Sequence, residues 1–261
     1  MTETSPGSVQ CATARPHVAE AGLAIWVLTS VGFVVAVINL LIYRARWDFI
    51  AAHPVYSAGQ PPTISRALSD PAIGEPFAFW MLLAAPLLVL GLCAILALVE
   101  MDLRRFGAGQ VNLARVRALF VLIVLLQTVA AVGIVMLSHY RMPEATPRHM
   151  TGSYLFFIAQ TGTVLAGGIV SGWLRALPEG PGRLTLARMH EFRRRMAAVP
   201  LLLAALYLVL FVAKHFTFPV GNEAVYLAYV STEPVVITAM LLYLALFAVD
   251  TGVIVLRYFR A

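Results

Sequence analysis

The side chains best suited to chemistry are four histidines and a glutamate that stand beside long apolar stretches of the chain. They are His53, His139, His149, His215 and Glu233. Imidazole and carboxylate groups bind zinc, and the same two groups can move a proton as general acid and base. The sequence therefore offers all five as candidate metal ligands, with Glu233 and His149 as candidate catalytic residues. No two histidines have the His-x-x-x-His spacing that places two ligands on one helix face, so histidines scattered along a membrane interface are the alternative.

The composition limits what can position these groups. Of the 261 residues, 60% are hydrophobic and 12% are charged, and the mean hydropathy is +0.83. Soluble domains carry about 25% charged residues. A soluble enzyme or a nucleic-acid-binding protein would need more charge to cover its surface, so we expect an integral membrane protein with no nucleic-acid partner.

Six apolar stretches are long enough to cross a bilayer, whose core needs about 20 residues of helix. They cover residues 21–43, 77–99, 119–140, 151–174, 197–216 and 230–256. The predicted fold is therefore all-α, a single six-helix transmembrane bundle over residues 21–256, with tails over residues 1–20 and 257–261.

The distribution of basic residues predicts the orientation of the bundle, because short cytoplasmic loops retain Lys and Arg. Thirteen of the 19 basic residues fall in the N-terminal tail, the second and fourth loops and the C-terminus. Both termini are therefore predicted to be cytoplasmic, in a protein of the plasma or inner membrane. The four histidines and Glu233 then share the outer side.

The last span contains two acids, which are costly inside a membrane and by default indicate a functional site. Glu233 lies near its outer end and Asp250 near its inner end. Pro234 follows Glu233 directly, so the helix either begins there or is kinked there. Arg257 lies two turns beyond Asp250, where it can pair with this acid or with lipid.

Basic residues before the fifth span predict a binding site for anionic headgroups on the cytoplasmic side, at about 1 kcal/mol for each arginine. They are Arg183, Arg188, Arg193, Arg194 and Arg195, in a stretch that we expect to form a short helix. The alternative is that these arginines serve only as a topology signal. In the fourth span, the Gly168-x-x-x-Gly172 spacing lets another helix approach closely, and that helix can belong to the same bundle or to a second copy.

These features together resemble one known family of membrane proteins. The bundle has six spans, the first outer loop contains Pro62-Thr63-Ile64-Ser65, a histidine precedes the fourth span, and two acids bracket the sixth. This pattern is similar to the DRAM, Frag and Sfk family, and the matched positions are Ile64, Ser65, His149, Glu233 and Asp250. The family includes autophagy modulators, GPI-anchor lipid-remodelling factors and the N-terminal domain of yeast cell-wall remodelling proteins. The resemblance implies a lipid-related role in membrane organisation, lipid remodelling or regulation of a partner.

Three functions follow as hypotheses. The first is a non-enzymatic protein that binds lipid or a membrane subunit, because catalytic motifs are absent from the sequence and intramembrane charge is sparse. The second is an outer-leaflet lipid-remodelling enzyme that uses Glu233 and His149, with a metal ion as its only candidate cofactor. The third is a transporter or channel, which would carry charged or broken-helix sites near the midplane.

Overall fold

The computed structural model describes residues 16–180 and 182–260, and all regular structure within them is helical. Six segments are long and apolar enough to cross a membrane, as predicted. Five are single helices, and the fifth in chain order joins the short helix α7 to α8. Their bounds are α1 Val18–Ala52, α4 Pro71–Phe106, α5 Leu113–His139, α6 Thr146–Leu174, α7 Ala187–Met196 with α8 Ala198–Ala213, and α9 Asn222–Arg260.

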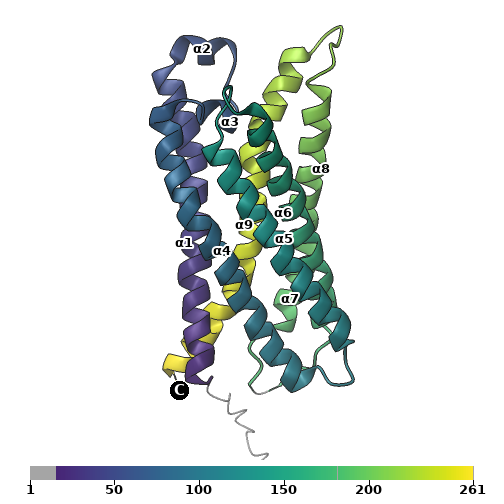
Figure 1. Ribbon diagram of the computed structural model, residues 1–261. Helices are drawn as coiled ribbons and strands as arrows, with labels where there is room; N and C mark the ends of the chain where they lie inside the picture. The colour runs from purple at the N-terminus through teal and green to yellow at the C-terminus, as the bar shows by residue number, and fades with distance from the viewer. Residues whose placement is uncertain (1–15, 181, 261) are drawn as a thin grey trace, which may run out of the picture.

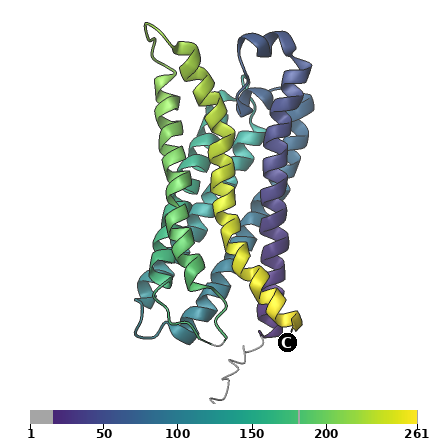
Figure 2. The ribbon, with the colours of Figure 1, turned by 180° about the vertical axis from the view of Figure 1, so that it is seen from behind.

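The spans form a closed ring in chain order. Each packs against the next, and α9 packs back against α1 (Figure 1). Seen from behind, α9 runs between α8 and α1 (Figure 2). Two short helices, α2 (Pro54–Gly59) and α3 (Ile64–Ala67), lie at one end of the bundle, which we call the α3 end. The start of α1, the end of α9 and helix α7 lie at the other end, the α7 end.

Most helices extend beyond the apolar stretches that predict them, because capping groups rather than hydropathy determine where a helix begins. Helix α4 begins after Asp70, whose carboxylate accepts the N–H of Ala72 at 2.9 Å. Helix α9 begins at Asn222 and continues through Pro234, so the last span does not begin at this proline. At the N-terminus, residues 1–15 of the predicted tail lie outside the described residues.

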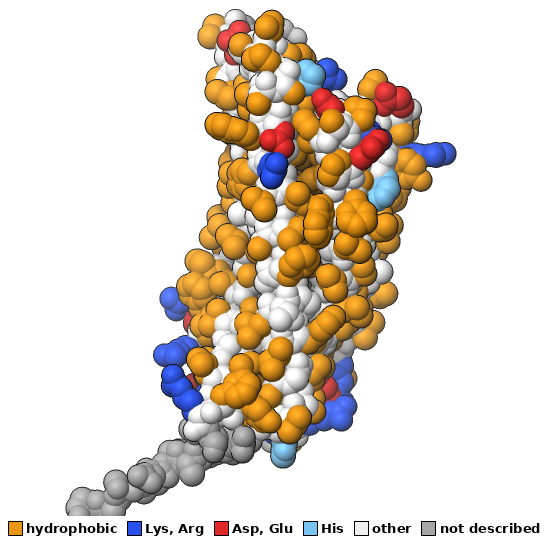
Figure 3. All heavy atoms as spheres, turned by 90° about the vertical axis from the view of Figure 1, so that its left-hand side faces the viewer, with side chains coloured by type: hydrophobic (Ala, Val, Ile, Leu, Met, Phe, Trp, Pro, Cys, Tyr) orange, Lys and Arg blue, Asp and Glu red, His pale blue; other side chains and the backbone are white. Residues whose placement is uncertain are grey.

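The surface of the bundle is that of a membrane protein. On the face shown in Figure 3, hydrophobic side chains cover the middle, and charged side chains gather towards the two ends. Leu40, Leu125 and Ile158 are among the large apolar residues that are exposed on the outside of the helix bundle. A polar contact between two spans lies inside the bundle, where Gln127 of α5 donates to Gln160 of α6 at 3.2 Å.

Glycines permit the closest helix contacts. A Cβ atom added to Gly152 of α6 would lie 2.6 Å from the backbone nitrogen of Leu137 in α5. The fourth-span glycines face their own chain: a Cβ atom on Gly168 would lie 2.9 Å from that of Ala197, and one on Gly172 would lie 3.2 Å from the Arg194 side chain. The close approach at Gly168 and Gly172 is therefore used within the bundle.

Candidate functional site

At the α3 end, two side chains from the spans hold the short helix α3. The carboxylate of Glu233 in α9 accepts the backbone N–H of Ile64 at 2.9 Å. The Nε2 atom of His149 in α6 lies 2.9 Å from the Ser65 hydroxyl. Glu233 is 5% exposed and His149 is 1% exposed, whereas Ser65 is half-buried. The structure thus brings four of the family-matched residues together.

The second contact of His149 defines the direction of this hydrogen bond. Its Nδ1 atom lies 2.9 Å from the backbone carbonyl of Tyr140. A carbonyl can only accept, so Nδ1 carries the proton and Nε2 accepts from the Ser65 hydroxyl. A hydroxyl that donates to an oriented imidazole is the arrangement of an activated nucleophile. The same two bonds also fasten α3 to the α5–α6 hairpin.

Among the described residues, the other three candidate histidines form no hydrogen bond or ion pair with Glu233. His53 has Nε2 3.0 Å from the carboxylate of Asp70, and this bond together with the N–H of Ala72 lowers the pKa of Asp70. His139 and His215 each use Nδ1 to contact a backbone carbonyl one turn earlier in the chain. Among residues 16–180 and 182–260, no three His, Cys, Asp or Glu side chains are placed to hold one metal ion.

Aromatic residues and a lysine line the α8–α9 side of the same end. The Lys214 ammonium lies 4.0 Å from the centre of the Tyr229 ring, and Tyr207 donates to the Tyr229 hydroxyl at 3.3 Å. Burial lowers the pKa of Lys214. Glu233 forms no ion pair among the described residues, and its carboxylate accepts its hydrogen bond from the backbone N–H of Ile64 in α3.

At the α7 end, two buried acids hold the loop that precedes α7. Asp102 of α4 accepts hydrogen bonds from the Leu184 N–H at 2.8 Å, the Thr185 N–H at 2.7 Å and the Thr185 hydroxyl at 2.6 Å. Asp250 of α9 accepts the Leu186 N–H at 3.2 Å. Both acids are almost fully buried.

Asp250 also forms an ion pair with Arg193 of α7, whose side chain is completely buried and lies 4.4 Å from the centre of the Phe247 ring. Arg257, for which the sequence offers Asp250 or lipid as a partner, donates to the backbone carbonyl of Arg183 at 2.9 Å. Asp250 pairs with Arg193 instead because α7 folds back against α9 and brings Arg193 closer.

The five arginines predicted to bind headgroups divide into two sets. Arg183 donates to the carbonyls of Leu174 and Leu177 and is buried, which lowers its pKa. With Arg193, it belongs to the interior. Helix α7 confirms the short helix expected before the fifth span. On this helix, Arg188, Arg194 and Arg195 are exposed. The predicted binding site for anionic headgroups therefore keeps only Arg188, Arg194 and Arg195 of the five arginines.

An exposed basic surface surrounds them. Glu191 of α7 is shared by Arg194 at 2.8 Å, Arg195 at 2.7 Å and Arg175 at 2.9 Å. Arg175 also lines a groove of about 360 Å³ between α5 and α6, together with Gln110, Asn112, Arg115 and Trp173. Within the part of the chain that the structure describes, the Arg115 guanidinium has no hydrogen bond or ion pair.

Sequence reasoning missed Asp102, Thr185 and this groove. In the sequence, Asp102 stands just after an apolar stretch. A charged side chain at such a position is usually expected to be exposed to solvent, so its burial was not predicted. Ser65 and His149 each match the family pattern, but nothing in their spacing predicts a contact across 84 positions of the chain.

Comparison with known proteins agrees with this architecture. A family model described as the Frag1/DRAM/Sfk1/Cwh43P N-terminal domain matches residues 21–252, which include most of all six spans. No curated protein and no solved structure matches the chain. The chain therefore belongs to the Frag1/DRAM/Sfk1/Cwh43P N-terminal domain family of membrane proteins.

Proposed function

We propose that this protein is a non-enzymatic, lipid-binding component of the cell membrane, whose α7 end faces the cytoplasm and binds anionic phospholipid. One observation carries the proposal. Of the five exposed arginines on α7 and in the groove between α5 and α6, three share one ion-pair partner, Glu191, and the other two form no ion pair among the described residues. The five are Arg115, Arg175, Arg188, Arg194 and Arg195.

The surroundings of these arginines suit a lipid better than a soluble anion. Trp173 lines the groove and Phe192 is exposed on α7, so aromatic side chains accompany the positive charges. Basic and aromatic residues at one depth are typical of segments that lie at the boundary of headgroups and acyl chains. A lipid phosphate in the groove would meet Arg115 and Arg175, and its acyl chains would lie along α5 and α6.

The experiment is a lipid titration of the purified, delipidated full-length protein, followed by native mass spectrometry. Phosphatidylglycerol is compared with phosphatidylcholine of the same acyl chains. The double variant Arg115→Gln/Arg175→Gln should bind phosphatidylglycerol roughly 30-fold more weakly, from about 1 kcal/mol for each arginine. Equal binding of the two lipids by the natural protein would refute the proposal.

A matched control keeps the change in net charge constant. Arg66 and Arg148 are exposed at the α3 end, outside the groove. The variant Arg66→Gln/Arg148→Gln should therefore leave phosphatidylglycerol binding unchanged. An equal loss in this control would show that total charge, not the groove, attracts the lipid. Self-association through Gly168 and Gly172 does not enter the proposal, because both glycines face their own chain.

A second candidate function is supported by the contact between Ser65 and His149. A half-buried serine that donates to an imidazole held by a backbone carbonyl could attack the carbonyl carbon of a lipid ester, with His149 Nε2 taking the hydroxyl proton. The ester C–O bond would break as His149 returns this proton to the departing alcohol, and the acyl group would remain on Ser65 until water hydrolyses it. In that case Ser65→Ala and His149→Gln would each abolish a change in the lipid profile of expressing cells, at unchanged yield of folded protein. Unchanged lipid profiles in both variants would exclude this second function.

A further inference from the structure

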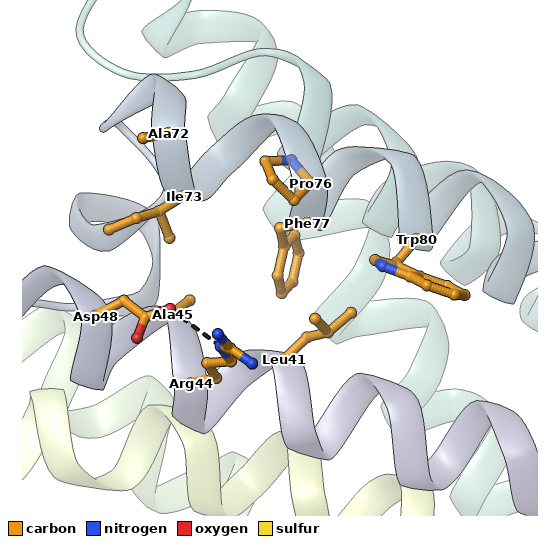
Figure 4. A pocket seen from close by; sticks show the side chains of 9 residues that line it. All are labelled: Leu41, Arg44, Ala45, Asp48, Ala72, Ile73, Pro76, Phe77 and Trp80. Carbon is orange, nitrogen blue, oxygen red and sulfur yellow. Dashed lines mark hydrogen bonds and ion pairs between the residues drawn. The ribbon is translucent and has the colours of Figure 1, made fainter.

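A pocket at the α3 end lies on the opposite end of the bundle from the basic surface. It has a volume of about 300 Å³ and opens between α1 and α4 (Figure 4). Leu41 of α1 and Phe77 of α4 face each other across it, and Trp80 lies at one side. The lining is thus apolar towards the middle of the bundle.

The opposite side of the pocket carries one charge of each sign. Arg44 and Asp48 are one turn apart on α1, and the Arg44 Nε atom donates to the Asp48 carboxylate at 3.2 Å. Their side chains are 70% and 45% exposed. Within the described residues, the other Arg44 nitrogens and the second Asp48 oxygen have no hydrogen-bond partner. Arg44 is the first charged residue after the apolar stretch of α1, so the pair lies where headgroups meet acyl chains.

The backbone adds a second acceptor. Pro76 lies inside α4 and has no N–H, so the carbonyl of Ala72 lacks its donor four residues later. Both residues line the pocket. A ligand that carries a cation with N–H groups could therefore donate to the Asp48 carboxylate and to the Ala72 carbonyl.

We propose that this pocket binds a zwitterionic phospholipid with a primary ammonium headgroup, of the phosphatidylethanolamine class. The Arg44 guanidinium contacts the phosphate, Asp48 and the Ala72 carbonyl accept from the ammonium, and the acyl chains follow Leu41, Phe77 and Trp80. The exposed ring of Phe33 in α1 continues this apolar path, because its centre lies 6.3 Å from that of the Trp80 ring.

The acceptors determine which zwitterionic lipid is preferred. Phosphatidylcholine has the same two charges but a quaternary ammonium without N–H groups, so it can satisfy Arg44 and cannot donate to Asp48 or Ala72. Loss of hydrogen bonds to a charged group should make phosphatidylcholine about tenfold weaker than phosphatidylethanolamine. The site is independent of the anionic-lipid proposal, because no residue is shared between the two.

The test is a titration of the delipidated full-length protein with phosphatidylethanolamine, phosphatidylcholine and phosphatidylglycerol of matched acyl chains, read by native mass spectrometry. Asp48→Asn removes the negative charge that attracts the ammonium, so it should lower the preference for phosphatidylethanolamine and keep phosphatidylcholine binding. Arg44→Gln should weaken the binding of both zwitterionic lipids by the same factor. Arg148→Gln, at the same end but outside the pocket, should change neither.

Pro76→Ala provides a variant that removes an acceptor without removing a charge, because it restores the N–H that the Ala72 carbonyl lacks. It should lower the preference for phosphatidylethanolamine. Equal affinity of the natural protein for both zwitterionic lipids, or an unchanged preference in Asp48→Asn, would overturn the inference. Tighter binding of phosphatidylglycerol that depends on Arg44 would also overturn it, since the occupant would then be an anionic lipid.

Discussion

Asp102 shows what a buried acid does in this protein. It has no ion-pair partner among the described residues, yet three hydrogen bonds from Leu184 and Thr185 satisfy its carboxylate. Glu233 likewise accepts from a backbone N–H, that of Ile64 in α3. At the residue scale, these acids fix a loop or a short helix to the end of a span, and that role needs no reaction.

Replacement of Asp102 tests this role at the α7 end. Asp102→Ala leaves two backbone N–H groups without their acceptor, and each such loss costs about 1–3 kcal/mol. We expect the free energy of unfolding to fall by about 3 kcal/mol, with a smaller loss for Asp102→Asn. Denaturant titration of the protein in detergent micelles measures both. Glu179→Gln, an exposed acid of the same end, is the control, and an Asp102→Ala variant as stable as this control would contradict the role.

The corresponding change at the α3 end is Glu233→Ala. It removes the acceptor of the Ile64 N–H, so hydrogen exchange over residues 61–70 should become faster, while Glu233→Gln, which keeps an acceptor oxygen, should show a smaller increase. Glu223→Ala, an exposed site on the same helix, should leave the exchange rate unchanged. Unchanged exchange in Glu233→Ala would mean that other contacts hold α3.

At the scale of helices, the α5–α6 hairpin depends on close backbone approach. Gly152→Ala would place a methyl group 2.6 Å from the Leu137 nitrogen, and overpacking of this kind costs about 1–3 kcal/mol. We expect this loss in the free energy of unfolding, measured by denaturant titration in micelles. Gly32→Ala is the control, because no atom lies within 4 Å of the added Cβ atom. Equal free energies of unfolding for the two variants would show that α5 and α6 can move apart to accept the methyl group without loss of stability.

The same scale shows what the sequence can and cannot predict. The six spans follow from the apolar length of each stretch, which is a local property. The short helix α3 does not, because its four residues are held by Glu233 and His149, which lie 169 and 84 positions away from their partners. Similarly, the burial of Arg193 depends on how α7 packs on α9, so the five arginines before the fifth span could not be sorted by composition alone.

At the scale of the whole molecule, the orientation in the membrane is the first quantity to measure. With Cys11 and Cys93 replaced, a single cysteine is introduced either as Ala58→Cys in α2 or as Glu179→Cys at the α7 end. A membrane-impermeant thiol reagent should label Ala58→Cys on intact cells and label Glu179→Cys only after lysis. The reverse pattern would place the basic surface outside the cell and remove the basis for its proposed cytoplasmic partner.

The most direct test of the proposed function is the composition of the phospholipids that remain bound to the protein after purification. We predict that anionic phospholipid is enriched over its fraction in the surrounding membrane. We also predict that Arg115→Gln/Arg175→Gln abolishes this enrichment, while Arg66→Gln/Arg148→Gln preserves it. Bound lipid with the composition of the bulk membrane, or enrichment that survives loss of Arg115 and Arg175, would contradict the proposal.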